Sequence, residues 1–422
     1  MIVNKQLVLI KLILAITLSQ LQAQNFPGKS VFPGVTGFGT DTKGGYGGRI
    51  IRVTTLSRDG AGSLSEAIRA RGPRIVVFEV AGTIDLARRS LGIINPYITI
   101  AGQTAPYPGI TLVRGSLNIG TCEVIVQHIR VRPGEAGNAK MSGWEADGIS
   151  TVGGAWNVII DHCSLTWATD ENLSASGPQF EGDTPEEWRQ NTSHKIVFSN
   201  CIIAEGLSNS THSKGEHSKG TLVHDNVTDI LILKNLFASN VERNPLFSGG
   251  SQGLVINNYI SNPKEEAIHY ALAANEWGNR ELIPGIMGII GNVIETGPDT
   301  RKNLSAGSFK GPVKVYWKDN RFYGNPGVME ITGEFTKLNE VPFWPEGLRI
   351  MQSDDVKEYV LENAGAFPWQ RDSIDQQIIE RTKNETLRII NSERDAGGYP
   401  ETVPVFRKFN MSEDSIPGKH NL

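Results

Sequence analysis

The chain has 422 residues, 46 glycines and a formal net charge of −4 at pH 7. The balance of 41 basic and 45 acidic side chains argues against a nucleic-acid partner, which usually requires a strongly basic surface. Three cysteines are too few for a disulfide scaffold, and their odd number leaves at least one thiol unpaired in a monomer, the state that we expect.

The first 23 residues have the features of a cleavable export signal. Lys5 precedes an apolar stretch at residues 7–18, and the small-residue sequence LQA ends the segment. Because Lys11 interrupts the apolar stretch and the stretch is short for a bilayer span, an uncleaved anchor is the less favoured alternative. We therefore expect residues 1–23 to be removed and the protein to be secreted, extracellular or periplasmic, with no stable membrane span.

A short helix is predicted in the segment GAGSLSEAIRARGP. Ser63 and Glu66 have the spacing of a capping box, and Leu64, Ala67 and Ile68 fall on one side of the predicted helix. We expect this amphipathic helix to cap the exposed N-terminal end of the fold.

Six short apolar runs between residues 124 and 295 end on the same kind of polar residue. They read VIVQHIRV, VIIDHCSL, IVFSNCII, ILILKNLF, LVINNYIS and GIIGNVIE, and a looser copy, VYWKDNRFY, follows them. The apolar residues alternate as in a strand, and the copies recur every 23 to 38 residues, which is typical of a solenoid. The sequence therefore predicts an all-β parallel β-helix, with its catalytic domain at residues 24–350.

Parallel stacking of these copies aligns one polar side chain from each coil, so that side-chain amides can hydrogen-bond along a ladder. The predicted ladder consists of His128, His162, Asn200, Asn235, Asn258, Asn292 and Asn320. Cys163 and Cys201 each follow a ladder residue on neighbouring coils. Two interpretations stand, a disulfide between the coils or two buried free thiols, and we favour the second.

The pattern changes from about Asp354. The segments DVKEYVLENAGA and SIDQQIIERTKNETLRIINS have helical periodicity. We interpret residues 351–422 as a partly helical C-terminal cap that packs along the β-helix and carries no chemistry of its own.

Four acidic residues enter two consecutive repeats. EADGI contains Glu145 and Asp147, and ATDENLS contains Asp170 and Glu171 one coil-length later. Any one of them alone is more often a solvated loop charge. Acids at matching points of adjacent coils converge, however, and clustered carboxylates suit a hard cation such as Ca²⁺. We therefore predict a calcium site at these residues.

Two basic residues hold comparable positions on later coils. Lys219 precedes an apolar segment, and Arg243 follows the run ILILKNLF. An Arg before Asn-Pro is usually an ordinary loop charge, but an Arg that faces an acidic cluster can bind a substrate carboxylate. The duplicated HSKG leaves Lys214 as a competitor of Lys219, and His212 as a competitor of His217.

Taken together, the motifs resemble those of the pectate lyases of polysaccharide lyase family 1. The resemblance is carried by VTGFGTDTKGGYGG, ITIAGQTAPYPG, VRPGEAG, ADGIS, NVIIDHCSLTWATDE, EHSKGTLV and ERNPLF, over residues 32–259. It implies a right-handed β-helix that cleaves polygalacturonate, an acidic plant cell-wall polysaccharide, by Ca²⁺-dependent β-elimination to 4,5-unsaturated uronides. The resemblance also implies individual roles: Ca²⁺ ligands at Asp147 and Asp170, an accessory acid at Glu145, a lysine at Lys219 and a catalytic base at Arg243.

The chain departs from the family pattern at two positions. Ser174 replaces a further acid, for which Glu171 is the candidate substitute, and Ser248 replaces a second arginine. Asp161 and His162 match a buried pair of the family, which we interpret as structural. Because a guanidinium is normally protonated, the implied role of an arginine base requires neighbouring positive charge and alkaline conditions.

Two other functions remain open from the sequence. A glycoside hydrolase on the same fold could use Asp147 and Asp170 as its acid and base, although the strings NTD and GHG of such hydrolases are absent. A non-catalytic uronan-binding β-helix is favoured by the serines at positions 174 and 248. An unsaturated product distinguishes the lyase from both alternatives.

Overall fold

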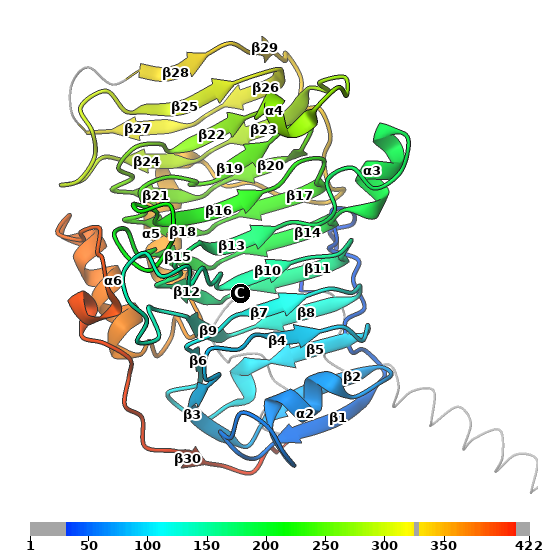
Figure 1. The fold of residues 1–422 in the computed structure, drawn as a ribbon, viewed down its shortest axis with the longest axis vertical. Helices are drawn as coiled ribbons and strands as arrows, with labels where there is room; N and C mark the ends of the chain where they lie inside the picture. Colours follow the sequence, from blue (N-terminus) through cyan, green and yellow to red (C-terminus); the bar gives the residue numbers. More distant parts are fainter. Residues whose placement is uncertain (1–30, 325–328, 411–422) are drawn as a thin grey trace, which may run out of the picture.

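The computed structural model describes residues 31–324 and 329–410, so the signal predicted at residues 1–23 lies outside the described residues. The described chain winds into coils that stack along the long axis of the molecule (Figure 1). Each coil contributes strands to three long sheets, and apart from β30 each strand pairs in parallel with the equivalent strand of the next coil. The predicted all-β parallel β-helix is confirmed.

The 11-stranded sheet contains β1 (Arg49–Val53), β2 (Arg74–Phe78), β5 (Ile98–Ala101), β8 (Val124–Gln127), β11 (Trp156–Asp161), β14 (His194–Ser199), β17 (Thr228–Leu233), β20 (Gln252–Ile256), β23 (Gly285–Ile290), β26 (Val313–Lys318) and β29 (Thr336–Lys337). The 9-stranded sheet contains β4 (Leu91–Ile93), β7 (Leu117–Ile119), β10 (Ile149–Thr151), β13 (Glu171–Ala175), β16 (Lys219–Val223), β19 (Leu246–Ser248), β22 (Ile268–Ala271), β25 (Ser305–Lys310) and β28 (Met329–Gly333). The 10-stranded sheet contains β3 (Val80–Asp85), β6 (Ile110–Val113), β9 (Ile129–Arg132), β12 (Ser164–Thr166), β15 (Ile202–Ala204), β18 (Leu236–Ala238), β21 (Tyr259–Ser261), β24 (Val293–Glu295), β27 (Arg321–Tyr323) and β30 (Val405–Phe406).

The core consists of apolar side chains that stand above one another on successive coils. Ile160 pairs with Phe198, which pairs with Ile232, which pairs with Val255, and all four side chains are fully buried. Burial of each such side chain contributes about 1.5–3 kcal/mol. The alternation seen in the sequence therefore supplies the force that stacks the coils.

The predicted N-terminal helix is confirmed as α2 (Leu64–Arg69), which packs against β1, β2 and β4 at the lower end of the stack in Figure 1. The backbone N–H of Glu66 donates to the hydroxyl of its N-cap residue, Ser63, at 3.2 Å. The Glu66 carboxylate accepts from the backbone N–H of Gly62 at 2.7 Å, one residue earlier than in a capping box.

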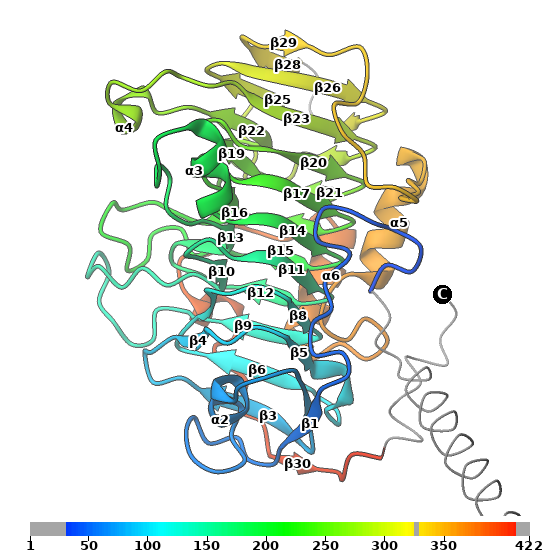
Figure 2. The same ribbon diagram turned by 90° about the vertical axis from the view of Figure 1, so that its right-hand side faces the viewer.

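The C-terminal segment lies along the side of the β-helix. Helices α5 (Ser353–Asn363) and α6 (Ser373–Lys383) pack against the 10-stranded sheet, where Val360 and Ile378 join a buried cluster with Trp167 and Leu236. The chain then descends through the 3₁₀ helix Glu393–Ala396 to β30, which pairs antiparallel with β3 at the base of the molecule (Figure 2). The remaining helices are short excursions at Gly102–Thr104, α3 (Pro185–Asn191) and α4 (Ala274–Trp277).

The polar ladder is real but shorter than predicted. The side-chain amide of Asn235 donates to Asn258, Asn258 to Asn292, and Asn292 to Asn320, at 2.9–3.0 Å. The proposed continuation through Asn200 is wrong, because Ser199 pairs with Leu233 and the amide oxygen of Asn235 accepts the backbone N–H of Cys201.

The residues assigned to the other end of the ladder therefore stand one position earlier in their coils. His128, His162 and Asn200 all have a positive φ, of 48–55°, at the turn between two strands. A shift of one residue moves a side chain to the opposite face of a strand. Cys163 and Cys201 occupy the inward position instead, and both are buried free thiols.

Candidate active site

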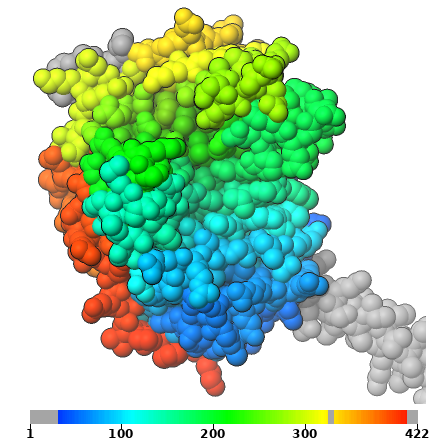
Figure 3. All heavy atoms as spheres, viewed as in Figure 1, coloured from blue at the N-terminus to red at the C-terminus, as the bar shows by residue number. Residues whose placement is uncertain are grey.

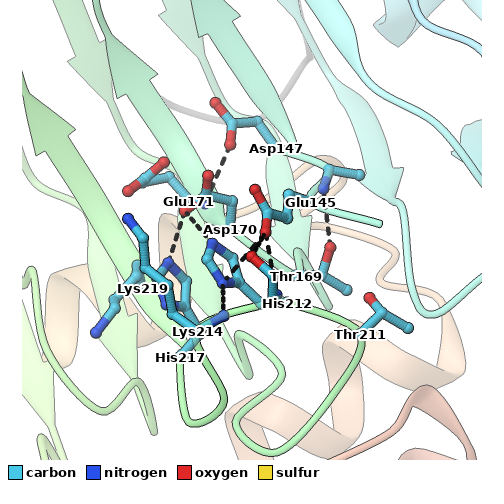
Figure 4. Close-up of polar contacts among 12 residues, drawn as sticks. Glu145, Asp147, Thr169, Asp170, Glu171, Thr211, His212, Lys214, His217 and Lys219 are labelled. Atoms are coloured by element: carbon cyan, nitrogen blue, oxygen red, sulfur yellow. Dashed lines mark hydrogen bonds and ion pairs between the residues drawn. The ribbon is translucent and has the colours of Figure 1, made fainter. Parts of the chain in front are cut away.

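The predicted functional residues gather where the chain enters consecutive strands of the 9-stranded sheet (Figure 4). Asp147 lies two residues before β10, Asp170 directly precedes β13, and Glu171 and Lys219 are the first residues of β13 and β16. Glu171 pairs with Lys219 in the parallel register. This face is bordered by loops on one side and by α3 and α4 on the other (Figure 3).

Three carboxylates form the centre of the site. Oxygen atoms of Asp147, Asp170 and Glu171 lie within 4.8 Å of one another. Asp147 is oriented by the backbone N–H of Glu171, which donates to Oδ1 at 3.1 Å, and by the hydroxyls of Ser174 and Ser150, which both donate to Oδ2. The serine that replaces the expected acid therefore holds a neighbouring acid in place.

The crowding of these carboxylates changes their protonation. Burial and the negative charge of Asp170 together raise the pKa of Asp147 to about 7, against hydrogen bonds that favour the charged form. Burial also acts to raise the pKa of Asp170, but the hydrogen bond from His217 and the charge of Arg243 outweigh it and lower that pKa. Oxygen donors that repel one another in this way fit a hard divalent cation such as Ca²⁺.

Glu145 lies beside this cluster but makes its hydrogen bonds to a neighbouring loop. Its Oε1 atom accepts hydrogen bonds from both the backbone N–H and the hydroxyl of Ser213, and these bonds lower its pKa. The same oxygen lies 3.5 Å from Nδ1 of His212. The structure thus separates Glu145 from the three-carboxylate group and places it against the loop that carries His212.

Arg243 and Lys219 are both held by carboxylates of the site. Nη1 of Arg243 makes a close ion pair with Oε1 of Glu171, and Nζ of Lys219 donates to Oε1 of Glu242 at 2.5 Å. Burial lowers the pKa of Arg243, while the charges of Asp170 and Asp147 act to raise it. The backbone of Arg243 has φ 62°, so its side chain leaves a tight turn directly before β19.

Curated relatives match most of the chain. "Probable pectate lyase C" of Aspergillus flavus is 31% identical over 398 residues, which cover 92% of this chain and 85% of the relative. The protein of the same name from Emericella nidulans is 32% identical over 406 residues, with 92% and 84% coverage. The chain belongs to the pectate lyase family. This pectate lyase is accordingly an enzyme of the lyase class.

Solved structures agree with the fold of this pectate lyase. A mutant of Bacillus subtilis pectate lyase gives a TM-score of 0.54 at 15% identity, over 82% of this chain and 99% of that chain. The major allergen from cedar pollen gives 0.54 at 17% identity, over 78% and 92%. At these identities the matches establish the β-helix fold alone. No family model matches the chain.

The structure separates the two lysines of the duplicated HSKG. Lys219 is buried within the sheet and contacts Glu242, whereas the side chain of Lys214 is exposed on the loop. Ser248, where the resemblance of the sequence led us to expect a second arginine, ends β19 and is half-buried. The pectate lyase therefore presents one lysine and one arginine to the carboxylate cluster.

Asp161 and His162 lie apart from this site, at the turn from β11 to β12. Asp161 accepts from Nδ1 of His162 at 2.8 Å and from the hydroxyl of Ser199 at 2.7 Å. The ring of His162 stacks on that of His128, whose Nδ1 contacts the backbone oxygen of Ala366. Burial lowers the pKa of His128 to about 3, so it stays neutral. These contacts support the structural interpretation.

The sequence interpretation missed two features of the site. Glu242, the partner of Lys219, directly precedes the arginine that was selected, but a single acid in a turn gives no signal of its own. The rings of His212 and His217 stack at 3.6 Å beside Asp170, where the sequence suggested only competition between them. Their repeat in HSKGEHSKG is the signal that could have indicated a pair.

None of the helices in residues 31–324 and 329–410 combines the length and the apolar character that a bilayer span requires.

Proposed function

We propose that this enzyme cleaves polygalacturonate by Ca²⁺-dependent β-elimination, giving 4,5-unsaturated uronides. The observation that carries the proposal is the convergence of three carboxylates with Arg243 and Lys219 at the entries of consecutive strands. The family of the chain and its similarity to a pectate lyase bound to a hexasaccharide, at a TM-score of 0.53 and 15% identity, support a polysaccharide substrate.

The carboxylates of Asp147, Asp170 and Glu171 are the residues that would hold Ca²⁺. When bound, the ion supplies positive charge that draws electrons from the uronate carboxylate and acidifies the adjacent C–H bond. Glu145, which contacts Ser213 and His212, is not one of these proposed ligands.

Arg243 is the proposed base. It removes the proton at C5, next to the substrate carboxylate. The electron pair of that C–H bond forms the C4–C5 double bond, the C4–O bond breaks, and the glycosidic oxygen takes a proton from water as it leaves. Burial already lowers the pKa of Arg243. Neutralisation of Asp147 and Asp170 by a cation would remove two of the three charges that oppose this shift, so that the neutral guanidine becomes more accessible at alkaline pH.

Lys219 binds the substrate carboxylate in this scheme. Its ammonium group stands at the start of β16 and contacts Glu242, which fixes the position of Nζ. Negative charge accumulates on the substrate carboxylate as the C5 proton leaves, and a charge-assisted hydrogen bond from Nζ stabilises it.

The spacing of the acids disfavours the hydrolase alternative. Inverting glycosidases keep their two carboxyl groups about 6.5–9.5 Å apart, and retaining enzymes about 5–5.5 Å apart. In this protein the oxygen atoms of Asp147 and Asp170 lie within 4.8 Å of each other. This spacing disfavours the inverting mechanism, which needs room for an attacking water between the two carboxyl groups, and it suits a shared cation.

The test is ultraviolet absorbance of the unsaturated product on polygalacturonate, with Ca²⁺ and with chelator. Wild type should produce the chromophore only with Ca²⁺, and Arg243→Ala should lose it by about 10²-fold or more. Arg381→Ala, which changes an exposed arginine in the last turn of α6, serves as the matched control. New reducing ends without absorbance would establish hydrolysis, and binding without any product would establish the non-catalytic alternative.

We further propose export of the protein, with residues 1–23 as its signal, 24–350 as the catalytic β-helix and 351–422 as the cap. The composition of the first segment and the family support this division. Mass measurement of the protein recovered from the culture medium should give a chain that begins at Gln24. Size exclusion of the same sample should give a monomer.

A further inference from the structure

Two histidines from one loop approach the carboxylate of Asp170. The loop between β15 and β16 carries His212 and His217, whose side chains are almost fully buried. Nε2 of His217 lies 2.7 Å, and Nε2 of His212 lies 3.8 Å, from the same oxygen, Oδ1 of Asp170. Figure 4 shows both rings beside Asp170.

The spacing of these three donor atoms matches a tetrahedral metal site. Metal bonds of about 2.0–2.2 Å to imidazole nitrogen and carboxylate oxygen require donor atoms roughly 3.3 Å apart. The observed separations of 2.7 and 3.8 Å lie on either side of that value, and all three donor atoms fall within 4.8 Å. The rings are stacked with an interplanar angle of 13°, so their Nε2 lone pairs run nearly parallel, and binding of one ion by both nitrogens requires the two rings to turn out of this stack.

We propose that His212, His217 and Asp170 form a second cation site, selective for a transition metal such as Zn²⁺, beside the calcium site. Two imidazole nitrogens suit Zn²⁺ or Co²⁺, whereas Ca²⁺ takes oxygen ligands. The oxygen-only group of Asp147, Asp170 and Glu171 and the nitrogen-rich group therefore select different ions.

The surroundings of His212 supply the outer contact that such a ligand needs. In the cation-free protein its Nδ1 accepts the backbone N–H of Lys214 at 3.1 Å, so the ring proton is on Nε2. Metal binding at Nε2 moves that proton to Nδ1, so the backbone N–H of Lys214 loses its acceptor, and the ring must turn for Nδ1 to donate to Oε1 of Glu145, which lies 3.5 Å away. A carboxylate behind a metal-bound histidine is a common arrangement and fixes the ring.

The shared carboxylate couples the two sites. This part of the inference rests on the proposed function, because it assigns Asp170 to the calcium site as well. A transition metal bound at Oδ1 withdraws negative charge from the calcium ligands and places a second positive ion beside them. Each ion should therefore weaken the affinity for the other by the same factor.

The test is titration of the full mature chain with Co²⁺, followed by its visible absorption, and with Zn²⁺, followed by calorimetry, both without Ca²⁺. Wild type should bind one ion with the intense absorption of a tetrahedral Co²⁺ site. His217→Gln and His212→Gln should each weaken binding by about tenfold or more. His194→Gln is the matched control, because His194 stacks on Trp156 at the start of β14.

Absence of a one-to-one Co²⁺ complex in wild type would overturn the proposal, and so would equal affinity in wild type and both variants. Thermal melts of the variants establish that they fold, and the wild-type titration stands even if they do not. An enzyme that is active with Ca²⁺ but binds no Co²⁺ refutes this site alone. Co²⁺ binding by a chain that yields no unsaturated product supports the site and refutes the proposed function.

Discussion

The hydroxyl of Ser174 donates a hydrogen bond to Oδ2 of Asp147 at 3.0 Å. A buried serine thus contacts a carboxylate of the proposed calcium site, at the position where the resemblance of the sequence led us to expect a further acid. Ca²⁺ affinity depends on the number of charged ligands. We therefore expect that an acidic side chain at position 174 would add a ligand to the site.

Ser174→Asp should therefore bind Ca²⁺ about tenfold more tightly than wild type, since it adds a carboxylate beside Asp147. Without Ca²⁺ the same change should lower the melting temperature, because it adds a buried negative charge to the cluster. Calorimetric Ca²⁺ titration measures the affinity. Ser174→Asn has the same size without the charge, and equal affinities for the Asp and Asn variants would contradict the prediction.

The raised pKa of Asp147 predicts a specific dependence of stability on pH. The unfolded group titrates near 3.8 and the folded group at about 7, so between these values the folded chain holds a proton that the unfolded chain has lost. The stabilisation that comes from this proton is fully present below pH 3.8, the pKa of the unfolded group, and it is lost as the pH rises through 7, the pKa of the folded group. Asp147→Asn should therefore gain stability relative to wild type between pH 4 and pH 7, in urea unfolding without Ca²⁺.

Addition of Ca²⁺ should reverse the order of these two proteins. At one hundred times its dissociation constant, Ca²⁺ stabilises wild type by about 2.7 kcal/mol, and Asp147→Asn should gain much less. Melting at pH 8 with and without Ca²⁺ measures the difference. A constant gap between the two proteins across pH and Ca²⁺ would show that Asp147 neither titrates near 7 nor binds the ion.

The assignment of Arg243 as base predicts a rate that rises with pH. Only the deprotonated guanidine accepts a proton, so activity should increase through the alkaline range, and the burial that lowers the pKa of Arg243 shifts this rise toward lower pH. Arg243→Lys should lose about 10²-fold or more in kcat at neutral pH. Full activity of this variant at neutral pH, measured by product absorbance, would refute the assignment.

Two buried carboxylates, Asp372 and Asp375, attach the C-terminal helices to arginines of the β-helix. Asp375 accepts from Nε of Arg130 at 3.0 Å and from Nη2 of Arg132 at 2.7 Å, with all three side chains fully buried. Asp372 also contacts both arginines, so Asp375→Asn removes one of their two carboxylate partners and should cost about 3 kcal/mol in the free energy of unfolding. Asp354→Asn, on the exposed side of α5, should cost little. Urea unfolding compares the two, and equal losses would contradict the prediction.

The stack is predictable from sequence because each coil repeats the same alternation, but its register is not. Asparagine serves two purposes here: in Asn200 it occupies the positive-φ turn, and in Asn235 it occupies the ladder one residue later. The residue type is identical, so the sequence alone cannot tell the two positions apart. In the Asn235 coil, Lys234 adopts the positive φ instead, which a propensity argument does not anticipate.

The residues at the starts of the strands were the ones from which the site could be predicted. Glu171 and Lys219 are paired on consecutive strands, and Asp147 stands in the same register one coil earlier, so the period of the fold brings them together with the adjacent Asp170. The stacked histidines depend on the course of a loop, and no repeat specifies that course. The contacts that the repeat of the coils determines can therefore be predicted from the sequence, and the contacts made by a loop that leaves the coil cannot.

The short pairing of β30 with β3 gives the molecule a property that a simple stack lacks. An open stack of repeats can fray one coil at a time, because each coil contacts only its neighbours. Here the chain leaves the uppermost coils, passes α5 and α6, and reaches the lowest coils at β30. Unfolding of the lowest coils thus breaks the pairing of β30 with β3. Release of the segment from α5 to β30 in turn exposes the 10-stranded sheet of the middle coils to solvent. The protein should therefore unfold as one cooperative unit.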